Sequence, residues 1–108
     1  MHTVVETLPY LASATKAGMS EAERIAAVDL ISANPGAGEV IVGGGGIRKI
    51  RVPGRGKGKS GGYRVLTYFM SENRPVYLLW ALNKSMASNL TDAQKAMLKE
   101  AAKDIRNG

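Results

Sequence analysis

The residues best suited to chemistry in this chain are basic, and they lie in one segment. Between Glu39 and Glu72 there is no acid and there are seven bases, which are Arg48, Lys49, Arg51, Arg55, Lys57, Lys59 and Arg64. Elsewhere eight bases and nine acids nearly cancel, so the net charge of +6 comes from this segment. Such a segment attracts polyanions, nucleic acid above all, because neutralising phosphates releases condensed counterions. A solvated basic loop that only aids solubility is the alternative.

Residues 53–60 match a phosphate-binding P-loop only in part. The GxxxxGK(S/T) pattern requires glycine where Pro53 stands, and Ser60 should begin a helix, whereas the residues after it predict a strand. We therefore do not expect nucleotide hydrolysis. A glycine-spaced basic loop is instead suited to the irregular phosphate backbone of RNA. The predicted RNA-binding residues are Lys49, Arg51, Arg55, Lys57 and Lys59.

Several kinds of catalytic group are missing from the sequence. His2 is the only histidine and there is no cysteine, which excludes a paired-histidine ribonuclease, a thiolate nucleophile and a zinc cluster. Near the basic segment there is no carboxylate cluster suited to Mg²⁺, so we expect no metal and no cofactor. Phosphoryl chemistry would then depend on Arg, Lys and Tyr side chains acting on RNA, whose 2′-hydroxyl supplies the nucleophile.

Arg64 is the main catalytic candidate because it stands at the start of a predicted strand, beside the basic loop. Strand alternation places it on the face shared by Leu66 and Tyr68. Lys84 ends the next predicted strand, so the two cations should be neighbours, and such a pair is unfavourable unless an anion joins them. A surface ion pair is the alternative for Arg64. Aromatic residues such as Trp80 are able to stack bases, with core packing as the alternative.

The elements that must position these residues follow from caps and periodicity. Thr7 and Gly18 are typical helix ends, and Ser20 and Thr91 each begin a capping box. Strands are expected near residues 4–5, 47–52, 63–70 and 76–83, and helices near residues 8–16, 20–34 and from 91 onward. The glycine-rich residues 36–46 are expected to be a flexible lead into the sheet. The order β-α-α-β-β-β-α predicts an α+β fold, a mostly antiparallel twisted sheet with two N-terminal helices packed on it and a C-terminal helix.

Two helix faces are also predicted. The second helix should bury Ala22, Ile25, Ala26 and residues 28–31, and the closing helix should bury a stripe of Leu90, Ala93, Met97, Ala101 and Ile105. With 108 residues, of which 44% are hydrophobic and 22% charged, we expect a single domain over residues 1–108. Neither a signal peptide nor an apolar run of about 20 residues is present, so we expect a cytoplasmic protein without membrane contact.

Three stretches of the sequence, Gly44–Lys49, Gly56–Val65 and Leu82–Ser85, together resemble the HigB-like branch of the RelE toxin superfamily. The similarity runs from about Gly43 to Lys103. The resemblance implies a small β-α-α-β-β-β fold that enters the A site of the 30S ribosomal subunit and cleaves mRNA. It also implies inhibition by a co-expressed antitoxin, which we expect to be of the helix-turn-helix type.

The resemblance also assigns roles to individual residues. Arg64 occupies the arginine position of the family's GYR motif, which contacts the scissile phosphate, and Lys84 matches the cation after the last strand. The preceding basic pair corresponds either to Lys57 and Lys59 or, by strand register, to Lys49 and Arg51. Relatives place a proton-transferring tyrosine near the C-terminus, yet no tyrosine follows Tyr77. Tyr68, a lysine of lowered pKa, or positioning alone would then replace it.

The sequence therefore predicts a ribosome-dependent, metal-independent mRNA endoribonuclease that acts as the toxin of a type II toxin–antitoxin system. Its expected catalytic residues are Lys57, Lys59, Arg64, Tyr68 and Lys84. Two alternatives stay open. The same cations would serve a non-catalytic module that binds RNA or the ribosome, or an inactive toxin homologue whose basic groove binds an acidic segment of an antitoxin.

Overall fold

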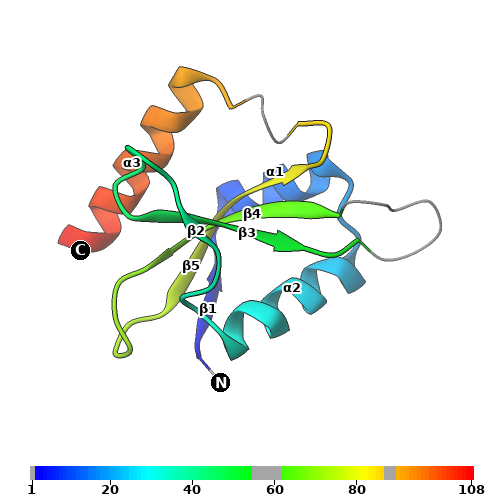
Figure 1. Cartoon of the computed structure of the whole chain (residues 1–108), viewed down its shortest axis with the longest axis horizontal. Helices are drawn as coiled ribbons and strands as arrows, with labels where there is room; N and C mark the ends of the chain where they lie inside the picture. The colour runs from blue at the N-terminus through cyan, green and yellow to red at the C-terminus, as the bar shows by residue number, and fades with distance from the viewer. Residues whose placement is uncertain (1, 55–61, 87–89) are drawn as a thin grey trace.

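The computed structural model describes residues 2–54, 62–86 and 90–108, so the predictions for Arg55, Lys57 and Lys59 lie outside the described residues. Its elements are β1 (Val4–Glu6), α1 (Leu8–Ala17), α2 (Glu21–Ala33), β2 (Glu39–Val40), β3 (Ile47–Val52), β4 (Tyr63–Phe69), β5 (Val76–Asn83) and α3 (Asp92–Asn107). The strands form one sheet in the order β1-β5-β4-β3-β2 (Figure 1). Only the β1–β5 pair is parallel among the described strand pairs. The predicted α+β fold is confirmed.

The helices begin and end where the sequence indicates. The side chains of Thr7, Ser20 and Thr91 each accept a hydrogen bond from a backbone N–H of the first turn that follows. Gly18 ends α1 with φ of +88°, a left-handed conformation that favours glycine. These caps satisfy backbone groups that the first and last turns leave without partners inside the helix. Within the described ranges, no helix has both the length and the apolar composition that crossing a lipid bilayer requires.

The sheet is covered on both faces, and each face has its own hydrophobic cluster (Figure 1). Helices α1 and α2 cover one face with residues such as Tyr10, Ala14, Ala27 and Ile31. Helix α3 covers part of the other face with Leu98 and Ala102. Because α3 lies over only one end of its face, the other end is left for polar side chains.

The glycine-rich lead into the sheet is not entirely irregular. Glu39 and Val40 form the short strand β2, which pairs antiparallel with Lys49 and Arg48. The lead approaches β3 closely at Gly38, where an added Cβ would lie 2.5 Å from the carbonyl oxygen of Lys49. The expectation of a flexible lead over residues 36–46 was therefore wrong at β2, because Gly38 with φ of +95° turns the chain back along β3.

The predicted buried face of α2 is confirmed only in part, since Ile31 is buried and Val28 packs against the same cluster, whereas Ala22 is exposed. Ile25 is 56% exposed, whereas Glu23 is fully buried together with Ala27 and Ile31. Glu23 accepts hydrogen bonds from the backbone N–H of Ser20 and, at 3.0 Å, from the hydroxyl of Tyr63. Because Glu23 is held against the sheet, residues two positions further along turn toward solvent.

The buried stripe of α3 is likewise displaced from the predicted one. Leu98 and Ala102 are buried, whereas Met97 is 44% exposed and Ala93 is exposed. Ile105 is partly buried and packs against the same cluster. Several alanines in this helix are compatible with more than one apolar face, so the contact with the sheet decides which face is buried.

Candidate nucleic-acid interface

Three cross-strand rows lie on the sheet face toward α3. Reading from β3 through β4 to β5, they are Arg51–Arg64–Leu82, Lys49–Leu66–Trp80 and Ile47–Tyr68–Tyr77. The last row is packed beneath α3, together with Leu98 and Ala102. Leu66 of the second row is buried in the same cluster, whereas the cations of the first two rows reach the surface: Lys49 and Arg51 are exposed and Arg64 is partly buried.

Arg51 and Arg64 are direct cross-strand partners. Arg51 is exposed and Arg64 is partly buried, with its Nη1 donating to the carbonyl oxygen of Tyr63 at 3.4 Å. Like charges placed directly opposite each other on a sheet are unfavourable. A phosphate between the two side chains would offset this repulsion, because each guanidinium group is able to donate two parallel hydrogen bonds to phosphate oxygens. We use the name basic row for the three cations of the first two cross-strand rows, which are Lys49, Arg51 and Arg64.

A β-bulge in β5 determines which residues face the basic row. Leu66 pairs with Trp80 and Thr67 pairs with Leu78, which leaves Leu79 as the extra residue. The extra residue changes the alternation of β5, so that Trp80 and Leu82 come to lie beside Leu66 and Arg64. Bulges of this kind re-aim side chains, and sequence alternation alone does not reveal them.

Lys84 follows β5 by one residue and is exposed. Asn83 pairs with Tyr63 and Leu82 pairs with Arg64, so Lys84 lies at the same end of the sheet as Arg64. At the same end, Gly62 has φ of +60°, and a Cβ on it would lie 2.3 Å from the carbonyl oxygen of Val52. This close approach holds the ends of β3 and β4 together next to the basic row.

Tyr68 is not brought to Arg64. It is 4% exposed and belongs to the cluster beneath α3. Its hydroxyl accepts a hydrogen bond from Nη1 of Arg106 at 3.4 Å. Tyr68 lies four positions along the extended strand from Arg64, so their Cα atoms are roughly 13 Å apart. This environment favours packing over proton transfer for Tyr68.

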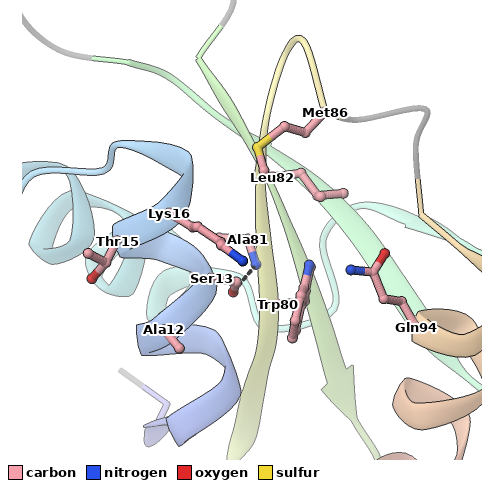
Figure 2. Close-up of a pocket in the computed structure, with 9 residues that line it drawn as sticks. All are labelled: Ala12, Ser13, Thr15, Lys16, Trp80, Ala81, Leu82, Met86 and Gln94. Carbon is pink, nitrogen blue, oxygen red and sulfur yellow. Dashed lines mark hydrogen bonds between the residues drawn. The ribbon is translucent and has the colours of Figure 1, made fainter.

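A groove lies beside the basic row, and sequence reasoning did not predict it. It has a volume of about 580 Å³ and runs between α1, β5 and the first turn of α3. Figure 2 shows Trp80 on its floor, with Lys16 of α1 on one side and Gln94 of α3 on the other. These three residues come from distant parts of the chain, so no local sequence signal links them.

The described residues contain no group of three or more His, Cys, Asp or Glu side chains arranged to hold a metal ion. The charged groups described so far at this interface are the cations of β3 and β4, Lys84 and Lys16, together with Glu39, which is the cross-strand partner of Lys49. Such a surface is able to bind phosphate groups and to stabilise negative charge that develops on them.

A sequence model of a known family, described as the RelE toxin of the RelE / RelB toxin-antitoxin system, matches residues 11–107. This chain belongs to the RelE toxin family. The matched region of this RelE toxin contains the basic row, the Trp80 groove and all three helices apart from the first residues of α1. The superfamily expected from the sequence is thereby confirmed, and the HigB-like branch stays a prediction.

Proposed function

We propose that this RelE toxin is a ribosome-dependent mRNA endoribonuclease of the HigB-like branch, which stops translation by cutting message in the A site of the 30S subunit. The single observation that carries the proposal is the Arg51–Arg64 pair, in which an exposed and a partly buried cation are direct cross-strand partners. The family match supports a toxin, and the pair supplies a place for the phosphate that the toxin would cut. Its place of action would be the cytoplasm.

The proposed reaction is a transesterification within the RNA. The 2′-oxygen forms a bond to the adjacent phosphorus while the bond to the 5′-oxygen breaks, leaving a 2′,3′-cyclic phosphate and a 5′-hydroxyl end. The 2′-hydroxyl loses a proton and the leaving oxygen gains one. Arg64, assisted by Arg51, would stabilise the phosphorane as its charge develops.

The two proton transfers require a base for the 2′-hydroxyl and an acid for the leaving oxygen. Because Tyr68 is buried beneath α3, we no longer propose it as the base. Lys84 lies at the same end of the sheet as Arg64 and would contact the RNA on the far side of Arg64. Lys57 and Lys59 remain proposals from the sequence. Alignment of the 2′-oxygen by the cations would supply much of the acceleration without any base, since a well-oriented intramolecular attack is strongly favoured.

The proposed antitoxin, of helix-turn-helix type, would inhibit by placing an acidic segment over the basic row. Complementary charge would speed the association, because an acidic segment is attracted over a distance of about one Debye length, ~8 Å at physiological salt. Binding of RNA and of this segment would then exclude each other.

The test is induction of the toxin in cells without an antitoxin, with Arg64→Ala and Arg48→Ala as matched variants. Arg48 belongs to the same strand as Arg51, but its neighbours Ile50 and Val52 show that even-numbered positions of β3 face the opposite side. We expect wild type and Arg48→Ala to arrest growth and produce new mRNA ends in translated message within minutes, and Arg64→Ala to do neither. Arrest with intact mRNA would favour the non-catalytic module instead, and equal growth of all three strains would defeat the proposal.

A further inference from the structure

The Trp80 groove continues the basic row across the sheet. Leu82 on its floor is the cross-strand partner of Arg64, and Trp80 is the partner of Leu66. Trp80 and Arg64 are therefore diagonal neighbours on the same face, with Cβ atoms roughly 7 Å apart. A nucleotide whose phosphate lies on Arg64 would have its base within reach of Trp80.

The floor of the groove is apolar but keeps one aromatic ring accessible. Ala81 is 1% exposed and Leu82 is 4% exposed. Trp80, which directly follows the bulge residue Leu79, is partly exposed. A bulky indole left partly uncovered beside a cationic row is suited to stacking against an unpaired base. The groove volume of about 580 Å³ is within the range of small-ligand sites.

Two polar side chains at the rim, Gln94 and Lys16, present hydrogen-bond donors to the groove. Oε1 of Gln94 accepts a hydrogen bond from the backbone N–H of Thr91, as part of the cap of α3. Its amide nitrogen is therefore the end that extends toward the groove, and Lys16 extends from the opposite wall (Figure 2). Among the residues that the structure describes, the lining of the groove includes a cation and no acid. Such a rim favours a ring that carries carbonyl acceptors.

We propose that this groove is a base-binding subsite, which takes one unpaired guanine or uracil of the RNA strand whose phosphate lies on the basic row. Guanine and uracil carry a carbonyl oxygen where adenine and cytosine carry an amino group, so Gln94 and Lys16 would favour the first two. This inference rests on the proposed function and adds to it a preference for sequence near the cut.

The test uses the fluorescence of Trp80, which is the only tryptophan in the chain. The full-length protein is titrated with single-stranded hexauridylate, hexaadenylate and an abasic ribose-phosphate hexamer, and binding of each is followed in parallel by anisotropy of a labelled strand. Hexauridylate should quench the tryptophan and bind most tightly, and the abasic strand should bind without quenching. Equal quenching by all three strands would overturn the subsite.

Two pairs of variants separate stacking from the polar preference. Trp80→Leu should weaken hexauridylate binding at least about fivefold, whereas Trp80→Phe, which keeps an aromatic face, should stay within about threefold of wild type. Gln94→Glu keeps a side-chain acceptor for the cap of α3 but replaces the amide donor with an anion, so it should abolish the preference for uracil with the fold intact. Unchanged binding in Trp80→Leu and Gln94→Glu would overturn the proposal.

The base distribution at cleavage sites in cells distinguishes failure of the subsite from failure of the proposed function. If Trp80→Leu cuts message with the same distribution as wild type, the groove is not a base subsite while the endoribonuclease proposal stands. If wild type does not cut message at all, the proposed function fails, and the titrations still decide whether the groove binds a base. Protection of Trp80 from an added quencher by the antitoxin, but not by RNA, would assign the groove to a protein partner and overturn the proposal.

Discussion

At the scale of single residues, the basic row places charge where it costs stability in the free protein. Arg51 and Arg64 oppose each other on neighbouring strands, and like charges in this position repel. Buried neighbours such as Val52 and Tyr63 hold the two strands in this register, so the arginines cannot separate by a shift of the strands. An anion bound between the two arginines would reduce this repulsion.

Replacing Arg51 therefore separates stability from activity. We expect Arg51→Gln to leave the free energy of unfolding unchanged or to raise it by up to about 1 kcal/mol, because cross-strand repulsion is removed. The same variant should lose at least about tenfold in mRNA cleavage, since charged contacts to phosphate contribute about 1.5–3 kcal/mol. Urea unfolding and mapping of mRNA ends measure the two effects, with Arg48→Gln as the control. Loss of activity together with a large loss of stability would indicate a purely structural role.

At the scale of elements, α1 closes an edge of β5 that β1 does not reach. β1 pairs with β5 only as far as Leu78. Beyond it, the backbone N–H of Ala81 donates to Oγ of Ser13 at 2.8 Å, and Nδ2 of Asn83 donates to the carbonyl oxygen of Ala17 at 3.2 Å. Ser13 also donates to the carbonyl oxygen of Tyr10. These contacts attach α1 beside the bulge and so form one wall of the Trp80 groove.

Ser13→Ala tests that attachment. The substitution leaves the buried N–H of Ala81 without its acceptor, which should lower the free energy of unfolding by about 1–3 kcal/mol. Thr15→Ala is the matched control, because the Thr15 hydroxyl bonds only within its own helix and is exposed, so its effect should stay within about 0.5 kcal/mol. Thermal and urea unfolding of both variants give the comparison. Equal stability of Ser13→Ala and wild type would show that α1 is held by its apolar contacts alone.

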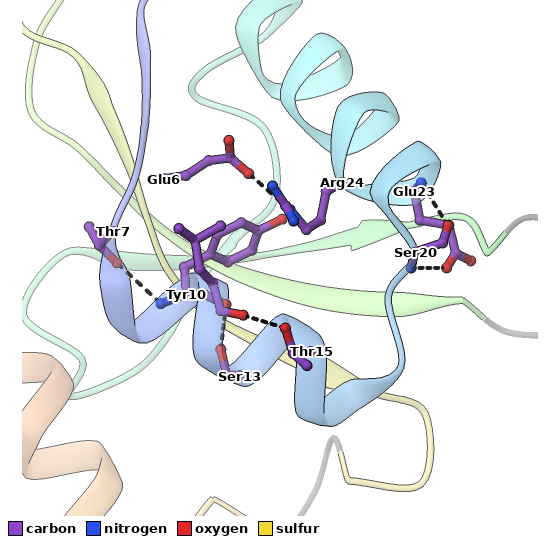
Figure 3. A network of polar contacts seen from close by, with 9 residues as sticks. Glu6, Thr7, Tyr10, Ser13, Thr15, Ser20, Glu23 and Arg24 are labelled. Atoms are coloured by element: carbon purple, nitrogen blue, oxygen red, sulfur yellow. Dashed lines mark hydrogen bonds and ion pairs between the residues drawn. The ribbon is translucent and has the colours of Figure 1, made fainter.

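At the scale of the whole molecule, Tyr10 lies where three elements meet. Figure 3 shows the side chains of Glu6 on β1, Tyr10 on α1 and Arg24 on α2 close to one another. The Arg24–Glu6 ion pair has an N···O distance of 3.5 Å, and Tyr10 is fully buried beside it. Burial, and to a lesser degree the negative charge of Glu6, raises the pKa of Tyr10 to about 12. Ionising this tyrosine is therefore coupled to unfolding of the core.

The stability of the protein should fall above pH 10 for this reason. The pKa of Tyr10 is higher in the folded state, about 12 against 10.0, so its contribution is complete below pH 10 and is lost as the pH rises toward 12. The loss should reach about 2–3 kcal/mol, because the pKa rises by about two units and each unit corresponds to about 1.4 kcal/mol. Tyr10→Phe should lack this component, as measured by urea unfolding at intervals between pH 9 and pH 12. Parallel curves for the two proteins would contradict the prediction.

Local sequence patterns were sufficient to predict the elements other than β2, and they also showed the segregation of charge. Caps at Thr7, Ser20 and Thr91 and alternation in residues 47–52 act over a few neighbouring positions, so they are readable without the fold. The seven bases of one segment are a property of composition. The family resemblance followed from the same local motifs around Arg64, and the family match agrees with it.

The tertiary structure alone decided which of these residues meet. The opposition of Arg51 and Arg64, the bulge at Leu79 and the groove around Trp80 depend on pairing between segments far apart in the chain, which local periodicity does not encode. Glu23 and Tyr68 are buried for the same reason, since each is held by a partner distant in sequence. Local sequence thus determines where the helices and strands form, and long-range packing determines which residues form the interface.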